Sequence, residues 1–114
     1  MSNVLGPGGQ LTPGQDITSL NNGYKLILQT DGNLVLYRLV DNHPLWATNT
    51  NNQNVVNAIM QNDGNFVLYL GNGSPVWASN THGNSGSFLS LQNDGNLVIY
   101  WPNYPAWASN TASS

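Results

Sequence analysis

The 114-residue chain carries little charge: five aspartates, no glutamate and two basic residues, Lys25 and Arg38, give a formal net charge of −3. This length allows one domain with a modest hydrophobic core. So few basic residues argue against nucleic acid or an anionic membrane as partner, and the absence of cysteine excludes disulfides and thiolate chemistry. Asparagine and glycine supply the polarity instead, so we expect a neutral partner rich in hydrogen-bonding groups.

The N-terminal segment is predicted to consist of turns and short strands. Residues 1–9 lack the basic and apolar regions of a signal peptide, and no apolar run in the chain approaches the length of a membrane span. We therefore expect no membrane insertion, and a protein that is cytoplasmic or released without a recognisable signal peptide, or secreted if a leader was removed from this sequence. Turn signals separate two predicted short strands, at 11–12 and 17–20.

A β-hairpin is predicted next, because strand-like runs at 24–29 and 33–37 flank an Asp-Gly turn signal. A two-residue loop would mix polar and apolar residues on each face. A three-residue loop over 31–33 keeps each face consistent by pairing Gln29 with Val35. One face then collects leucines for the core, and the other presents Gln, Asp, Asn, Val and Tyr side by side.

Two signatures recur in phase with a period of about 31 residues, which indicates one supersecondary unit that is copied and stacked. Gln-x-Asp-x-Asn-x-Val-x-Tyr occupies 29–37, 61–69 and 92–100, and Pro-x-Trp-Ala-(Ser/Thr)-Asn-Thr occupies 44–50, 75–81 and 105–111. No segment shows a helical period, so we predict an all-β fold with three or four short strands in each repeat. A single domain, 1–114, then contains repeats at roughly 24–50, 55–81 and 86–111.

The three units should close around a pseudo-threefold axis, because none can bury its apolar face alone. The tryptophans of the second signature are expected near the centre, and the inward candidates of the later hairpins are Met60, Phe66, Leu68, Leu91, Leu97 and Ile99. A β-trefoil also has threefold symmetry, but its repeats usually need about 40 residues or more. The shorter period favours a smaller unit.

The first signature has the chemistry of a shallow sugar site. Its two amides donate and accept hydrogen bonds, its carboxylate accepts them, and its phenol does either. Together these groups suit a polyol with adjacent hydroxyls, while the valine methyls cover a C–H patch. One Asp-Gly-Asn copy alone would indicate no more than a hairpin turn, but turn chemistry does not explain why Gln, Val and Tyr recur at the same offsets.

With three intact copies interleaved with Trp-Ala-(Ser/Thr)-Asn-Thr, the chain resembles the bulb-type (monocot, snowdrop-like) mannose-binding lectins over essentially its whole length. The resemblance implies a type II β-prism of three four-stranded antiparallel sheets with pseudo-threefold symmetry, one mannose site on each sheet, no enzymatic activity, no cofactor and no metal. Plant secreted members usually carry a disulfide, and Gly32 stands in the turn where a cysteine would be expected. In this respect the chain is more similar to cytoplasmic, microbial or animal relatives.

The resemblance also assigns roles within each site. Asp31 and Asn33 would bind the mannose 2-hydroxyl, Gln29 the 3-hydroxyl and Tyr37 the 4-hydroxyl, with Val35 packing on the ring. The corresponding residues are Gln61, Asp63, Asn65, Val67 and Tyr69 in the second site and Gln92, Asp94, Asn96, Val98 and Tyr100 in the third. The partners would be mannose and mannose-rich glycans or glycoproteins. A homo-oligomer, dimer or tetramer, is expected, with the C-terminal strand within 107–114 exchanged between protomers.

Two alternatives stay open. One is a non-catalytic structural or calcium-binding β-repeat, although one carboxylate in each turn is few for an ion that takes six to eight oxygens. The other is a glycosidase, which needs two carboxyls about 5–10 Å apart, whereas each repeat supplies one motif aspartate. His43 and His82 have no partner at metal-ligand spacing and are interpreted as solvated, Lys25 and Arg38 as solubilising, and the repeated Asn49, Asn80 and Asn110 as bonding turn backbone.

Overall fold

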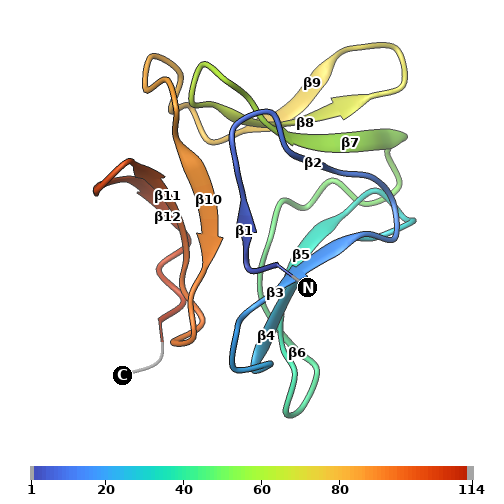
Figure 1. Ribbon diagram of the computed structural model, residues 1–114. Coiled ribbons are helices and arrows are strands. Elements are labelled where there is room, and N and C mark those ends of the chain that lie inside the picture. The colour runs from blue at the N-terminus through green and yellow to red at the C-terminus, as the bar shows by residue number, and fades with distance from the viewer. Residues whose placement is uncertain (1, 113–114) are drawn as a thin grey trace.

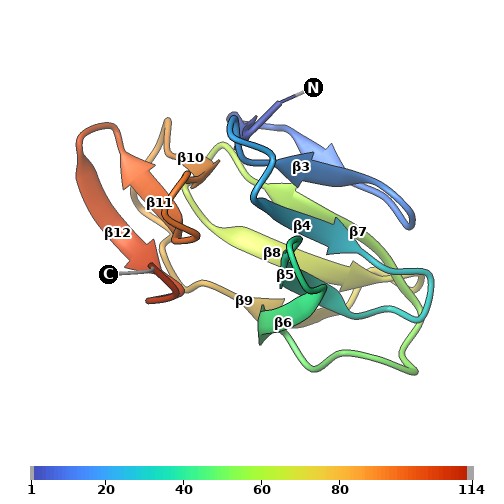
Figure 2. The same ribbon diagram turned by 90° about the horizontal axis from the view of Figure 1, so that it is seen from below.

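The computed structural model describes residues 2–112, which form three four-stranded antiparallel sheets arranged as the sides of a prism (Figures 1 and 2). The first sheet contains β3 (Asp16–Thr18), β4 (Tyr24–Leu28), β5 (Leu34–Arg38) and β6 (His43–Ala47); the second β2 (Gln10–Leu11), β7 (Val55–Met60), β8 (Phe66–Leu70) and β9 (Pro75–Ala78); the third β1 (Val4–Leu5), β10 (Phe88–Leu91), β11 (Leu97–Trp101) and β12 (Tyr104–Ala108). The predicted all-β fold of three four-stranded sheets is confirmed. No helix within the described residues is long and apolar enough to cross a membrane.

Each repeat supplies three strands of its own sheet, and the N-terminal segment supplies the fourth strand of all three (Figure 1). Strand β1 lies beside β10, β2 beside β7 and β3 beside β4, so the segment crosses from sheet to sheet. It pairs one edge of every three-stranded meander that would otherwise stay open. Short strands were predicted close to the positions of β2 and β3, whereas β1 was not foreseen.

The inward faces of the sheets meet in one apolar core. The six inward candidates of the second and third hairpins are fully buried, as are the leucines of the first. Trp46, Trp77 and Trp107 form a triangle of edge-to-face contacts, with ring centroids 5.4–5.8 Å apart. Such contacts are favoured by the quadrupoles of the rings. The tryptophans therefore lie at the pseudo-threefold axis, as predicted.

The hairpin loop has the predicted length of three residues but lies one residue earlier in the chain. The closing pair is Gln29 with Asn33, and Ile27 rather than Gln29 pairs with Val35. The reason is the position of Gly32, whose φ is +92°. A three-residue loop is a type I turn followed by a left-handed residue, so the glycine must be its last position. The predicted and observed pairings differ by two residues, so every side chain stays on the predicted face of the sheet.

Each sheet also carries a bulge that the sequence did not reveal. In β6, β9 and β12 the proline pairs with the motif tyrosine and the tryptophan pairs with the residue just before that tyrosine, so one extra residue stands between proline and tryptophan. The extra residues are Leu45, Val76 and Ala106. Bulges re-aim side chains next to functional sites. Here the bulge lets the tryptophan point to the axis while its strand still flanks the tyrosine.

Candidate functional site

The five residues of each motif come together on the outer face of one sheet. In the first sheet Gln29 follows β4, Asp31 and Asn33 belong to the turn, and Val35 and Tyr37 lie on β5. Gln29 Nε2 donates a hydrogen bond to Tyr37 Oη, and the same bond joins the two ends of the motif in the other sheets. The structure therefore builds three equivalent surface clusters from the residues that the motif singled out.

The aspartate and asparagine of each cluster are oriented by the backbone of their own turn. Asp31 Oδ1 accepts a hydrogen bond of 2.9 Å from the backbone N–H of Asn33, with the same distance in the other two turns. Asn33 Oδ1 in turn accepts from the backbone N–H of Thr50 at 3.2 Å. Within residues 2–112, Asp31 Oδ2 and Asn33 Nδ2 form no hydrogen bond to another protein atom, so one acceptor and one donor remain for a ligand.

The second signature supports the first, a role that its recurrence in phase could have indicated. Thr50 Oγ1 donates to the carbonyl of Gly32 at 2.7 Å and shares a hydrogen bond of 2.8 Å with the buried Thr48 hydroxyl. Ser79 with Thr81 and Ser109 with Thr111 repeat this network.

The repeated asparagines of that signature contribute through their backbone conformation. Asn49, Asn80 and Asn110 have φ of +58°, +61° and +60°. Asparagine enters this left-handed region more readily than most residues. Their structural role was predicted to come from side-chain hydrogen bonds to turn backbone. Within residues 2–112 these three side chains form no such bond, and the bonds to turn backbone come instead from the motif asparagines, so this part of the prediction was wrong.

Replacing Thr81 by valine is expected to destabilise the protein by about 1–3 kcal/mol, because the buried carbonyl of Gly64 and the Ser79 hydroxyl each lose a hydrogen bond. The side chain keeps its shape, so packing is preserved. Urea unfolding measures the loss. Thr30→Val is the control, since Thr30 is exposed and its substitution should change stability by less than about 0.5 kcal/mol. Equal effects of the two variants would contradict the proposed network.

The motif valines are more covered than a ligand-packing role suggests. Val35, Val67 and Val98 are each 3% exposed, although they lie on the outer face. Ile27 and Ile59 lie directly across from the first two, and Ser90 across from the third. These neighbours stand two residues before the motif glutamine and were missed. In the first sheet Ile27 lines a shallow hollow together with Gly14, Gln29, Thr30 and Asp31.

Each turn packs against another part of the chain, which is a connecting segment for the first two turns. Gly32 lies against the carbonyls of Thr50 and Gln53. Gly64 lies in the same way against the carbonyls of Thr81 and Asn84. Gly95 instead lies against the ring of Tyr24. Asn21, from the N-terminal segment, donates its backbone N–H to Asn93 Oδ1 and its Nδ2 to the Asn93 carbonyl, both at 3.0 Å. The N-terminal segment thereby closes the ring of three repeats.

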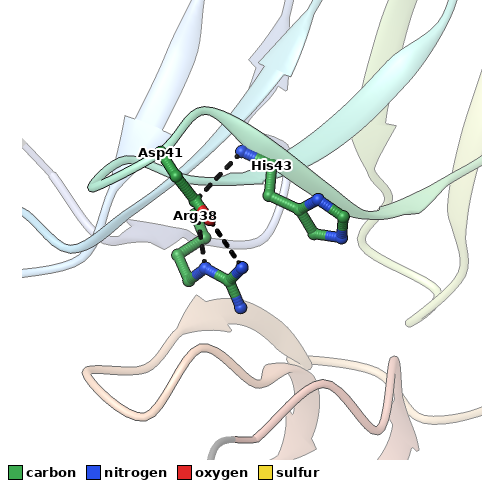
Figure 3. A network of polar contacts seen from close by, with 3 residues as sticks. All are labelled: Arg38, Asp41 and His43. Carbon is green, nitrogen blue, oxygen red and sulfur yellow. Dashed lines mark hydrogen bonds and ion pairs between the residues drawn. The ribbon is translucent and has the colours of Figure 1, made fainter.

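A separate polar network lies at the tip of the β5–β6 hairpin (Figure 3). Arg38 donates two hydrogen bonds to Asp41, at 3.0 and 2.7 Å, and the backbone N–H of His43 donates to the same carboxylate at 3.3 Å. The Arg38 hydrogen bond is the main reason that the pKa of Asp41 falls to about 2, and the same pair raises the pKa of Arg38. Arg38 therefore orders a turn, beyond the solubilising role expected of it.

Nuclear magnetic resonance titration of the Asp41 carboxyl should give a midpoint near 2, and Arg38→Gln should return it toward the ordinary value of 3.8. Because the folded pKa is the lower one, this pairing stabilises the protein above about pH 3.8. The contribution is lost as the pH falls toward 2. The pair is exposed, so its contribution is small. A midpoint near 3.8 in the parent chain would contradict the ion pair.

No group of three or more His, Cys, Asp or Glu side chains in the described part of the chain is placed to hold a metal ion. The motif aspartates stand one on each sheet. Each cluster instead offers amide, carboxylate and phenol groups on an open surface. Fold and clusters together define a β-prism of the lectin type.

Comparison with known proteins places the chain within that class. No family model matches the sequence. A monomeric monocot mannose-binding lectin from Gastrodia elata is 38% identical, covering 98% of this chain and all of the other, with a TM-score of 0.85. The mannose-specific agglutinin of snowdrop, Galanthus nivalis, complexed with methyl α-D-mannoside, is 40% identical over 99% of this chain and all of the other, with a TM-score of 0.77. The chain belongs to the bulb-type mannose-binding lectin family.

Other relatives extend the comparison to assembly and length. A domain-swapped lectin dimer from Mycobacterium smegmatis is 47% identical, covering 90% of this chain and 94% of the other, with a TM-score of 0.55. Mannose-specific lectins from Narcissus and Dendrobium are among the curated relatives, and the chain spans at most 60% of the length of the curated relatives it matches. Lectins are carbohydrate-binding proteins without enzymatic activity, which supports the prediction that the chain is not an enzyme.

Proposed function

We propose that the chain is a metal-independent lectin that binds mannose-containing glycans at its three motif clusters. The observation that carries this proposal is the set of polar side-chain atoms that form no hydrogen bond within the protein and can therefore bind a ligand. On each sheet a carboxylate oxygen and an amide N–H stand at one turn, next to a glutamine–tyrosine pair. A sugar hydroxyl both donates and accepts, so the carboxylate and the amide suit one hydroxyl between them.

The proposed roles follow the family resemblance. Asp31 and Asn33 bind the axial 2-hydroxyl, which distinguishes mannose from glucose, while Gln29 binds the 3-hydroxyl and Tyr37 the 4-hydroxyl. The small exposed part of Val35 contacts the ring. The snowdrop agglutinin, which is 40% identical to this chain, is described as mannose-specific and complexed with methyl α-D-mannoside. The equivalent residues act in the second and third sites.

A single shallow site should bind one hexose weakly, with a Kd on the order of millimolar. Three sites on one chain supply multivalency, which can raise the apparent affinity for a branched glycan by about 10²–10⁴ when the spacing fits. We further propose that the chain forms a dimer or tetramer by exchanging its C-terminal strand. The domain-swapped relative supports exchange, whereas the relative from Gastrodia is described as monomeric. Light scattering tests this proposal, and a sharp monomer would contradict strand exchange.

Calorimetric titration with methyl α-mannoside, glucose and galactose, each with and without a chelator, tests the proposed function. We expect binding of the mannoside alone, near three sites on each chain, and no effect of the chelator. Loss of binding with the chelator would favour the calcium-binding alternative. Absence of mannoside binding at tens of millimolar would contradict the proposal and leave the fold as it is.

A further inference from the structure

The three sheets differ at two positions beside the conserved clusters. Two and four residues before the motif glutamine, the strands β4, β7 and β10 present outward side chains. The nearer position lies across from the motif valine and the farther from the motif tyrosine. The nearer residues are Ile27, Ile59 and Ser90, and the farther ones Lys25, Asn57 and Phe88. The third sheet thus reverses the order of the other two, with a polar residue near and an apolar residue far.

The far position of the third sheet forms an aromatic pair. The rings of Phe88 and Tyr100 have centroids 5.7 Å apart and are tilted by 32°. Both side chains are partly exposed. Tyr100 belongs to the motif, so the aromatic surface is continuous with the third cluster. Strand β1 lies beside β10 (Figure 1). Its Val4 pairs with Ser90 on the same face and is 37% exposed.

At the farther position the other two sheets carry polar residues. In the first sheet Lys25 lies across from Tyr37, and Asp16 pairs with Ile27 on the same face. In the second, Asn57 lies across from Tyr69 and donates a hydrogen bond of 3.2 Å from Nδ2 to Gln10 Oε1. Neither surface offers a second aromatic ring beside the motif tyrosine. The three clusters therefore have the same five motif residue types and differ in the side chains that surround them.

We propose that the third site binds an oligosaccharide over two sugar rings: mannose in the motif cluster and a linked second hexose on Phe88 and Tyr100. This rests on the proposed function of the clusters. A pyranose has a face of C–H groups, and the electron-rich face of an aromatic ring is its favoured partner. The Ser90 hydroxyl, between Phe88 and Gln92 on the same face, offers the second ring a hydrogen-bonding group. The first and second sites bind a single mannose.

The test uses a chain in which only the third site remains, with Asp31→Ala and Asp63→Ala. Titration with methyl α-mannoside and with an α-linked mannose disaccharide gives the ratio of the two affinities. We expect the disaccharide to bind roughly 2–10-fold more tightly. Phe88→Asn, which installs the residue of the second site, should bring this ratio to about one, and Phe88→Tyr should keep it. Tyr104→Asn is the matched control, because Tyr104 is 66% exposed and pairs with Trp101 on the opposite face of the same sheet.

The reciprocal substitution guards against a folding effect of Phe88→Asn. With only the second site intact, through Asp31→Ala and Asp94→Ala, Asn57→Phe should raise the ratio. A ratio that does not change with either Phe88→Asn or Asn57→Phe would overturn the inference. If the chain with only the third site binds methyl α-mannoside but gives a ratio near one, the second-ring subsite alone fails. If the unsubstituted chain binds no mannoside, the proposed function fails with it.

Discussion

Single substitutions of the motif aspartates by alanine will each remove one of the three proposed mannose sites and leave the other two. The variants are Asp31→Ala, Asp63→Ala and Asp94→Ala. A hydrogen bond to a charged group is worth about 1.5–3 kcal/mol, so its loss weakens a millimolar site roughly 10–150-fold and takes it out of the measurable range. Calorimetry with methyl α-mannoside should give two sites for each single variant and no binding for the triple variant.

Substitution of the same aspartates by asparagine separates the carboxylate's charge from its role in the turn. Each aspartate also accepts the backbone N–H two residues later, so alanine removes a turn contact as well. Aspartate to asparagine keeps an oxygen acceptor for that contact and removes the charge, so a site lost in both variants needs the carboxylate itself. Asp41→Ala, at the β5–β6 tip, should leave three sites. Three sites in Asp63→Ala would show that the second cluster does not depend on this carboxylate.

Gly64→Ala is expected to destabilise the protein by about 2–6 kcal/mol. Gly64 has φ of +93°, and a Cβ there would clash with the carbonyl of Asn84 and lie 2.9 Å from that of Thr81. Backbone strain and steric overlap therefore add. Thermal or urea unfolding measures the loss, and the second mannose site should weaken with it.

Gly83→Ala is the matched control for that experiment. Gly83 has φ of +90°, close to that of Gly64, but an added Cβ would meet nothing within 4 Å. Its cost should therefore be the strain alone, about 1–3 kcal/mol. The difference between the two variants isolates the contact of the turn with its linker. Equal losses would mean that the linker gives way and does not hold the turn in place.

Much of the architecture could be predicted because it depends on local patterns. The period of about 31 residues predicted three stacked units, and alternation along each strand predicted which side chains face the core. Leu34 and Leu36 are fully buried while Asp31 is exposed, as that alternation requires. The loop was predicted one residue too late, but this shifts the strand pairing by two residues and leaves every side chain on its predicted face. The candidate clusters followed for the same reason, since each lies within nine consecutive residues of one hairpin.

The features that no sequence pattern predicted join residues distant in sequence. The pairing of Val4 with Ser90 and the contact of Asn21 with the third turn each join segments whose pairing no local pattern specifies. The hydrogen bonds from Thr50 to the turn and the cover over Val35 also arise from strands that meet only on folding. The repeating unit and its outward chemistry could be predicted from the sequence, because the period of the repeat and the alternation along a strand are properties of neighbours along the chain. The surroundings that make the third cluster unlike the other two depended on the sheet, because only strand pairing places Phe88 across from Tyr100.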